Sequence, residues 1–371
     1  MVKRWFALVL ALLTTAACSP VGAASTASGS ASPSASSSAS TAASGSAATE
    51  PSLVDIGAGL TGQPGLAATV YATGPSNVAA FAFDATGRLW VATAAYTDSG
   101  GDAVYLVAGA GAAAIKVGSG LHTVLGLLWI GGELYVAAAG GVTAYGDFDG
   151  ATFATRRTVV ALPAGSGEVN GLVLGTDGRI RLGISAPCDH CTPTTAYSAT
   201  IVSFLPDGSD LRVEASGIRA PVGLAYLPGT DDLLVSMDQR DDLGSATPGD
   251  WLGLVEAGQS WGSPSCYGQG GSACAGVPAP VAVLDPHAAV SGVAIVTGSL
   301  GPAVGTAALV AEWSLGRVQR VTLQATASGY VGTVEPFVAG IGAPVAVATA
   351  PDGAVLVGDW STGTIYRIAR A

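Results

Sequence analysis

From Val78 to the C-terminus, the sequence repeats one pattern of hydrophobic and polar positions. An alternating apolar run is followed by a tight turn with Gly or Asp and then by a second apolar run. The turn glycines Gly87, Gly132 and Gly178 lie 45 and 46 residues apart, which is the length of one four-stranded propeller blade and exceeds a single hairpin. The pattern occurs in residues 78–93, 124–138, 169–184, 221–237, 290–310 and 344–368.

The period of two residues within each run indicates antiparallel strands rather than helices. Six such units predict an all-β protein, a six-bladed β-propeller over residues 51–371, since a closed ring leaves few exposed sheet edges. The longer segment 247–280 separates the fourth unit from the fifth and is predicted to form loops over one face, where propellers bind ligands.

The N-terminus has the pattern of an export signal. Residues 1–17 contain Lys3 and Arg4, then an apolar core, then small residues that lead to Cys18. The sequence TAAC resembles a bacterial lipobox, which predicts a lipid on Cys18 and a protein outside the cytoplasm, anchored to the cell membrane. The alternative is an ordinary secretory signal and a secreted protein. Residues 18–50 are almost entirely Ser, Ala, Thr and Gly and are predicted to be a disordered tether.

Composition narrows the function. The chain has 371 residues with 26 acidic and 15 basic side chains and a net charge of -11. The only lysine after the signal is Lys116, so binding to a nucleic-acid backbone is not expected.

Four cysteines follow Cys18, in PCDHC and CYGQGGSAC. An even number of cysteines in an exported protein predicts disulfides. Three pairings exist, and closeness in sequence favours Cys188 with Cys191 and Cys266 with Cys274. The alternative is a four-thiolate zinc site.

A charged cluster, 238–242 (DQRDD), follows the fourth repeat directly. Carboxylate and backbone oxygens of such a loop can hold Ca²⁺, which makes Asp238, Asp241 and Asp242 candidate ligands. The alternative is a solvated acidic turn.

Several motifs in order give a resemblance to a known family. RAPVGL (219–224), DQRDDLG (238–244), GQSWGSPSCYG (258–268) and the terminal GTIYRI resemble the soluble quinoprotein glucose and sorbosone dehydrogenases. These are six-bladed propellers that bind pyrroloquinoline quinone (PQQ) and calcium.

The resemblance implies roles for single residues. Arg219 corresponds to the arginine that faces quinone and substrate, and Trp261 to an aromatic position of the site. Gln239, Arg240 and Asp241 correspond to the segment that contacts cofactor and calcium. Arg317 and Arg320 are candidates to neutralise the carboxylates of the quinone.

The family's catalytic base is missing. A histidine that removes the substrate proton stands before Leu172 in the family, and this chain has Glu168 and Asn170 in that stretch. A general base needs reach and a suitable pKa, so Glu168 and His122 are the candidates to replace it.

Two functions follow from this resemblance. The first is a PQQ-dependent oxidoreductase acting on CH–OH groups of a sugar or related alcohol or aldehyde, with an external electron acceptor. The second is a propeller of the same family that binds a carbohydrate or protein without turnover. A calcium-dependent propeller hydrolase would need several acidic and amide side chains on the axis, which the sequence does not show clearly.

Overall fold

The computed structural model describes residues 52–97 and 99–371. The predicted signal peptide, Cys18 and the tether to residue 50 lie outside the described residues. Within the described ranges, no helix is long and apolar enough to cross a membrane.

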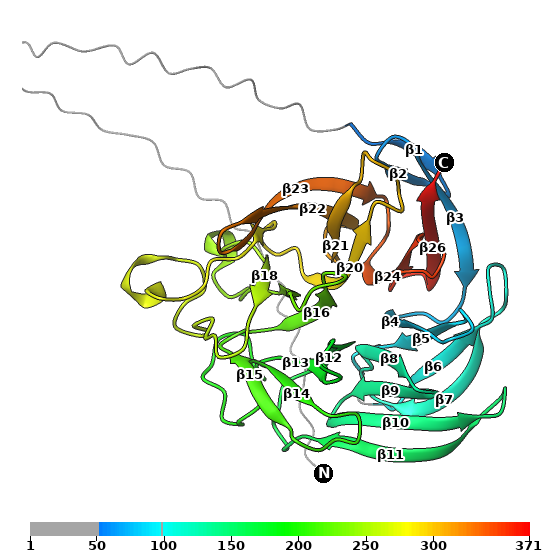
Figure 1. The fold of residues 1–371 in the computed structure, drawn as a ribbon, viewed down its shortest axis with the longest axis horizontal. Helices are drawn as coiled ribbons and strands as arrows, with labels where there is room; N and C mark the ends of the chain where they lie inside the picture. The colour runs from blue at the N-terminus through cyan, green and yellow to red at the C-terminus, as the bar shows by residue number, and fades with distance from the viewer. Residues whose placement is uncertain (1–51, 98) are drawn as a thin grey trace, which may run out of the picture. The chain divides into compact units, whose positions relative to one another are not determined.

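The described chain forms six antiparallel sheets around a common axis, which confirms the all-β six-bladed propeller (Figure 1). Each predicted repeat supplies the first two strands of one blade. The strands of blades 1 to 3 are β4 (Val78–Phe83), β5 (Leu89–Thr93), β6 (Asp102–Val107), β7 (Ile115–Leu121); β8 (Gly126–Ile130), β9 (Glu133–Ala138), β10 (Gly141–Phe148), β11 (Phe153–Ala161); β12 (Val169–Leu174), β13 (Ile180–Ile184), β14 (Thr200–Phe204) and β15 (Arg212–Ser216).

Blades 4 to 6 complete the ring. Their strands are β16 (Pro221–Tyr226), β17 (Leu233–Met237), β18 (Trp251–Val255), β19 (Ala282–Val283); β20 (Val290–Thr297), β21 (Thr306–Glu312), β22 (Arg317–Thr326), β23 (Gly329–Ala339); β24 (Pro344–Thr349), β25 (Val355–Asp359) and β26 (Thr364–Arg370).

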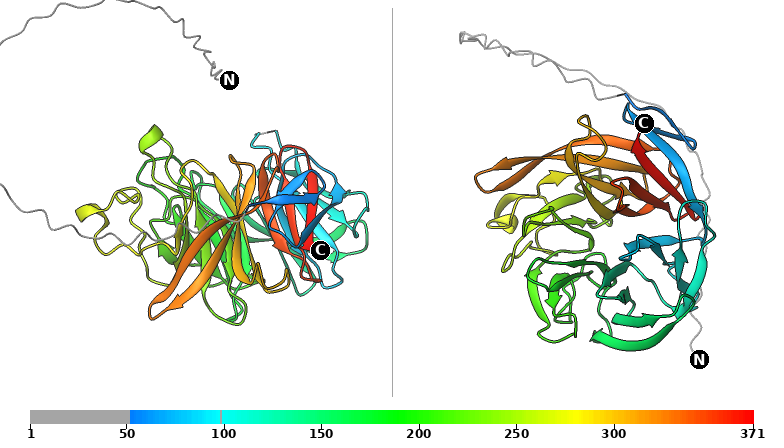
Figure 2. Two further views of the ribbon diagram at one scale, coloured as in Figure 1. Left: turned by 90° about the horizontal axis from the view of Figure 1, so that it is seen from above. Right: turned by 45° about the vertical axis from the view of Figure 1, so that its right-hand side comes forward.

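An N-terminal strand closes the ring. β3 (Leu66–Thr73) pairs antiparallel with the last strand, β26, with Ala72 opposite Ile365. Figure 2 shows the two strands side by side from further directions. β1 (Val54–Gly57) and β2 (Leu60–Gly62) extend blade 5 through β23. The two chain ends of the propeller are therefore held together by backbone hydrogen bonds rather than by side-chain contacts alone.

The core consists of separate apolar clusters, one between each pair of successive blades. The cluster between blades 1 and 2 centres on Trp90, and that between blades 2 and 3 contains Tyr135 and Phe204. Comparable clusters fill the other four gaps. Burial between blades, not within a single sheet, therefore holds the ring together.

Small residues let the innermost strands approach one another. A side chain at Gly126 would lie 2.3 Å from the carbonyl oxygen of Asn170 in the next blade, and one at Gly223 would lie 2.5 Å from that of Ser291. The equivalent residue is Gly171 in blade 3, Gly292 in blade 5, Ala80 in blade 1 and Ala346 in blade 6. This recurring small residue sets a narrow central ring.

The segment 247–280 is more than an insertion. It contains β18, the third strand of blade 4, followed by a loop with the short 3-10 helix η2 (Gly271–Cys274), which projects outward in Figure 1. A second 3-10 helix, η1 (Gly244–Ala246), precedes β18. Cys188 is bonded to Cys191 and Cys266 to Cys274, as sequence proximity favoured, so these cysteines are not available as zinc thiolates.

Candidate functional site

An axial cavity of about 330 Å³ opens where the innermost strands begin. Its wall comes from six equivalent positions, each directly before the small residue that sets the ring. Four of these six side chains are apolar and two, Asn170 and Ser291, are polar. The four apolar residues are Ala79, Leu125, Val222 and Val345. The size is at the lower end of small-molecule sites, which span about 300–1,000 Å³.

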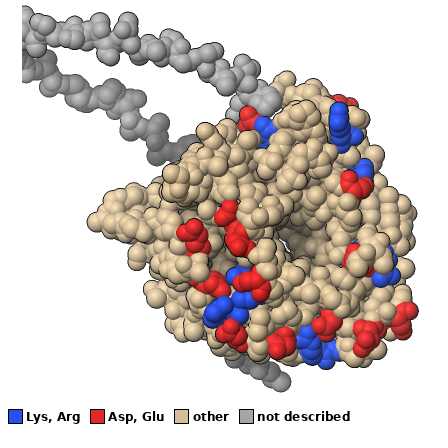
Figure 3. All heavy atoms as spheres, viewed as in Figure 1, with Lys and Arg blue, Asp and Glu red and all other residues tan. Residues whose placement is uncertain are grey.

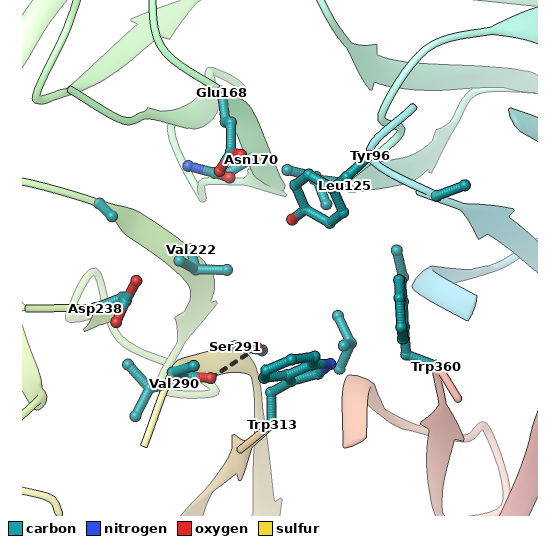
Figure 4. Close-up of a pocket in the computed structure, with 15 residues that line it drawn as sticks. Tyr96, Leu125, Glu168, Asn170, Val222, Asp238, Val290, Ser291, Trp313 and Trp360 are labelled. Carbon is teal, nitrogen blue, oxygen red and sulfur yellow. Dashed lines mark hydrogen bonds between the residues drawn. The ribbon is translucent and has the colours of Figure 1, made fainter. Parts of the chain in front are cut away.

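Larger side chains reach the cavity from the ends of the second strands. Asp238 follows β17, Trp313 follows β21 and Trp360 follows β25, while Tyr96 lies in the loop after β5 (Figure 4). The second strands of all blades run in the same direction, so their ends meet on one face of the ring. Glu168, directly before β12, completes this set.

Trp313 and Trp360 form an aromatic wall of the cavity, and a third aromatic side chain, Tyr96, faces it. The rings of Trp313 and Trp360 meet edge to face with centroids 6.0 Å apart, and Figure 4 shows Tyr96 across the cavity from Trp313. The indole Nε1–H of Trp360 donates to the carbonyl oxygen of Ala94 at 2.7 Å, which ties blade 6 to blade 1 and fixes the ring.

The opposite side of the cavity is acidic and continues into a second, more open lobe of about 570 Å³. Tyr96, Glu168 and Asp238 line both lobes, and Asp189 and Arg219 line the second. Glu168, Arg219 and Asp238, three residues singled out from the sequence, therefore converge on one site. In Figure 3, charged side chains gather on one side of the central opening.

Burial raises the pKa of both carboxyl groups that line the two lobes. The pKa of Asp238 rises to about 6, mainly through burial, although its ion pair with Arg219 at 3.0 Å lowers it. Burial also raises the pKa of Glu168, and Arg219 opposes this shift. Glu168 is exposed to the cavity, but the surrounding walls replace much of its hydration.

Arg219 is the centre of an ion-pair network. Its guanidinium donates to Asp189 Oδ1 at 2.6 Å and to Asp238 Oδ2 at 3.0 Å. Asp189 also accepts the backbone N–H groups of Asp241 and Asp242. The PCDHC loop of blade 3 is thereby fastened to the acidic loop of blade 4, and the charge of Arg219 is already neutralised within the protein.

The predicted cofactor loop makes contacts within itself and with two neighbouring loops. Gln239 donates through Nε2 to the carbonyl oxygen of Tyr267 at 3.0 Å. Arg240 donates twice to Asp242 at 2.6 Å, with its guanidinium 4.7 Å from the ring centre of Tyr267. Asp241 pairs with His287 Nδ1 at 2.6 Å. None of these four predicted residues lines the axial cavity.

Trp261 and His122 also lie away from the axial cavity. Trp261 is buried and stacks on Trp251 with ring centres 4.4 Å apart, beside a small cavity next to Arg219. His122 follows β7 and approaches Gly100 of the neighbouring loop. Of the two predicted replacements for the missing base, the structure places Glu168, and not His122, in the site.

The two predicted arginines of β22 are engaged elsewhere in blade 5. Arg317 forms ion pairs with Glu312 and Asp285, and Arg320 pairs with Glu335. Neither lines the axial cavity or its acidic lobe. Among the described residues, Arg219 is the only Lys or Arg in the lining of either lobe.

Sequence reasoning missed the aromatic residues Tyr96, Trp313 and Trp360. A signal for them exists, because Trp313 and Trp360 follow the second strands of repeats 5 and 6 as Asp238 follows that of repeat 4. The cavity wall also has a signal in the sequence, because each of its six residues directly precedes the recurring Gly or Ala in the first strand of a blade.

The comparisons with known proteins agree with this architecture. Residues 204–367 match the family model of glucose / sorbosone dehydrogenase. No curated protein has a significant sequence match to the chain. The chain is thus a six-bladed propeller in which residues 204–367 are similar to this family.

Several solved structures share the fold. The PQQ-bound aldose sugar dehydrogenase of Streptomyces coelicolor is 19% identical, with 83% of this chain and 99% of that chain covered and a TM-score of 0.66. A protein of carbohydrate-active enzyme family AA12 from Trichoderma reesei is 16% identical, with coverages of 87% and 98% and a TM-score of 0.68. The apo aldose sugar dehydrogenase of Escherichia coli is 16% identical, with coverages of 82% and 100% and a TM-score of 0.63.

The residues of the site do not fit PQQ, which carries three carboxylates. A site for such an anion needs basic side chains or backbone N–H groups, whereas the lining contributes Glu168, Asp189 and Asp238 against the paired Arg219. Nor do Asp238, Asp241 and Asp242 form a calcium site by their side chains. Across the described part of the chain, no three His, Cys, Asp or Glu side chains are grouped to hold a metal.

Proposed function

We propose that this chain is a divergent propeller of the glucose and sorbosone dehydrogenase family that binds a sugar in its axial cavity without holding PQQ. The export pattern and Cys18 support a place outside the cytoplasm, anchored to the membrane by a lipid.

One observation carries this proposal, namely the combination of an aromatic wall with hydrogen-bond acceptors in one cavity. Tyr96, Trp313 and Trp360 offer flat apolar faces to the C–H side of a sugar ring. Glu168 and Asp238 offer carboxylate oxygens to its hydroxyl groups. A few convergent polar groups in an otherwise apolar pocket are typical of small-molecule sites.

The experiment is a titration of the purified protein with glucose, galactose, glucosamine and N-acetylglucosamine, followed by tryptophan fluorescence and calorimetry. We expect saturable binding of at least one sugar with a change in fluorescence, because two tryptophans line the cavity. A parallel titration with PQQ and Ca²⁺ is expected to show no stoichiometric complex at micromolar concentrations. Absence of binding by every sugar would overturn the proposal.

Oxidation of the bound sugar is a second candidate, which one observation favours. Glu168 lies in the site, and burial raises its pKa, which is the direction that favours a general base. Stoichiometric PQQ binding with sugar-dependent dye reduction, lost in Glu168→Gln, would establish this function and contradict the first proposal.

A further inference from the structure

The acidic and aromatic surfaces of the axial cavity select for charge as well as shape. We propose that the preferred ligand is a sugar bearing a protonated amine, held between the aromatic wall and the carboxylates of Glu168 and Asp238. This inference rests on the proposed function and names the substrate class of the same site.

The polar groups of the axial cavity are acceptors more than donors. Glu168 and Asp238 present carboxylates to the space, and Ser291 donates its hydroxyl to the carbonyl oxygen of Ala289 at 3.1 Å. Asn170 is fully buried in the wall, and its amide donates to Ser185 at 2.8 Å. Its Oδ1 has no hydrogen-bond partner among the described residues. Two of these acceptors, the carboxylate of Glu168 and Oδ1 of Asn170, have no donor among the described residues, and the carboxylate of Asp238 accepts only from Arg219. This set of acceptors favours a ligand rich in N–H and O–H groups.

The charge of the site favours a cation. Arg219 is shared by Asp189 and Asp238, so its single positive charge faces two carboxylates before Glu168 is counted. A neutral sugar would leave this excess of negative charge uncompensated. An ammonium group would compensate it, with N–H donors that form charge-assisted hydrogen bonds.

The aromatic wall is suited to the same group. Cations are attracted to the faces of Trp and Tyr, and such aromatic cages bind substituted ammonium groups. Trp313 and Trp360 meet edge to face, and Tyr96 lies in the cavity across from Trp313 (Figure 4). An amine-bearing sugar can therefore present its ring to one indole and its ammonium to the carboxylates.

The test compares three sugars that differ at one substituent. Glucosamine carries an ammonium group, N-acetylglucosamine a neutral amide, and glucose a hydroxyl at that position. Calorimetry on the purified protein at low salt is expected to give at least about tenfold tighter binding of glucosamine than of the other two, since a hydrogen bond to a charged group adds more than a neutral one. Salt should weaken the binding of glucosamine but not that of glucose.

Variants assign the preference to the site. Glu168→Gln keeps the shape and removes the charge, so we expect the affinity for glucosamine to fall about tenfold further than the affinity for glucose. The matched control is Glu256→Gln, at an exposed loop position outside both lobes, which is expected to change neither affinity. Unchanged thermal unfolding of both variants checks that the fold is retained.

The outcomes separate the two proposals. Equal affinity for all three sugars would overturn the inference about charge and leave the sugar-binding function in place. Binding of tetramethylammonium without binding of any sugar would overturn the proposed function, and with it the claim that the cation is part of a sugar. A preference for glucosamine that survives Glu168→Gln and Asp238→Asn would overturn the assignment to these carboxylates.

Discussion

Tyr96 is the most unusual residue of the cavity. Its φ of 53° places a bulky side chain in the left-handed region, which costs on the order of 1–3 kcal/mol unless the surroundings enforce it. Although Tyr96 is 56% exposed, its ring lies inside the axial cavity. Burial by the walls and then the nearby carboxylates of Glu168 and Asp238 raise the pKa of its hydroxyl. The strained backbone therefore delivers a neutral hydroxyl and an aromatic face to the site.

Trp313 allows a direct test of the aromatic wall. Trp313→Ala should weaken sugar binding about tenfold, because it removes a contact surface worth on the order of 1–2 kcal/mol. The side chain is 40% exposed, so its loss is expected to change stability little. Leu315→Ala is the matched control, since Leu315 is 44% exposed in the same turn and lines no part of the cavity. Equal losses of affinity in the two variants, measured by calorimetry, would contradict the role of Trp313.

At the scale of elements, Asp189 joins the loops of two blades. Its carboxylate accepts hydrogen bonds from Arg219 and from two backbone N–H groups of the 238–242 loop. Asp189→Asn keeps the size but replaces one acceptor oxygen with a donor. We expect faster hydrogen exchange in residues 238–247 and a loss of about 1–3 kcal/mol in unfolding free energy.

Asp147→Asn is the control for this prediction, because Asp147 is exposed on β10 and has a positive φ that Asn also tolerates. Its exchange pattern should match that of the unmodified protein. If the 238–247 segment exchanges equally in all three proteins, Asp189 does not hold the two loops together.

The closing strand β3 should be sensitive to substitution where its side chains are buried between blades. Ala72 is 3% exposed in the cluster between blades 6 and 1, whereas Val70 on the same strand is 49% exposed. Ala72→Glu would bury a charge and is expected to lower the unfolding free energy by about 3 kcal/mol or more. Val70→Glu should lower it by less than about 1 kcal/mol. Similar denaturant midpoints for the two variants would show that β3 does not seal the ring.

The sequence predicts the blades better than it predicts their closure. Tight turns such as that at Gly87, where Asp84 accepts the N–H groups of Thr86 and Arg88, are local and leave a readable pattern. The pairing of β3 with β26 is not local, because nearly 300 residues separate the strands, and an eight-residue strand carries no mark of its partner.

The candidate site was predictable only in part for the same reason. Asp238 and Arg219 could be predicted as site residues from the sequence because they border a recognisable repeat. The assignment of Arg317 and Arg320 to a cofactor did not foresee their carboxylate partners, among them Asp285 in the loop after β19 and Glu335 on the neighbouring strand β23. Charge in a sequence shows which groups exist, and only the fold shows which of them are already paired.

At the scale of the whole molecule, negative charge dominates. The chain carries a formal charge of -11, and part of it is buried at or near the axis and in blade 5. Burial is the main cause of a raised pKa in four carboxyl groups. It raises the pKa of Asp238 to about 6 and that of Asp250 to about 7, and it also raises the pKa of Glu168 and of Glu312. Each of these groups is more easily ionised in the unfolded chain, so each favours folding most when it is protonated.

Stability should therefore rise as the pH falls from 8 to about 5. The contribution of a raised carboxyl is complete below its unfolded pKa near 4 and is lost as the pH rises through 6 to 7. We expect the midpoint of thermal unfolding to be about 5 °C higher at pH 5 than at pH 8. Below about pH 4 the trend should reverse, because ion pairs with Arg157 and Arg181 lower the pKa of Glu133 and Asp177, and their contribution is lost as they protonate.

Asp250 links this pH dependence to a particular contact. It is 1% exposed, and its two oxygens accept the backbone N–H groups of Gln239 and Val290, which join blades 4 and 5. Asp250→Asn loses one of these hydrogen bonds and is therefore expected to be less stable at pH 5. Because the amide cannot ionise, the unfolding midpoint of this variant should fall less between pH 5 and pH 8 than that of the unmodified protein. The exposed Asp231→Asn should keep the full slope. A midpoint that rises toward pH 8, or an Asp250→Asn variant with an unchanged slope, would show that burial of this carboxyl does not control the stability of the ring.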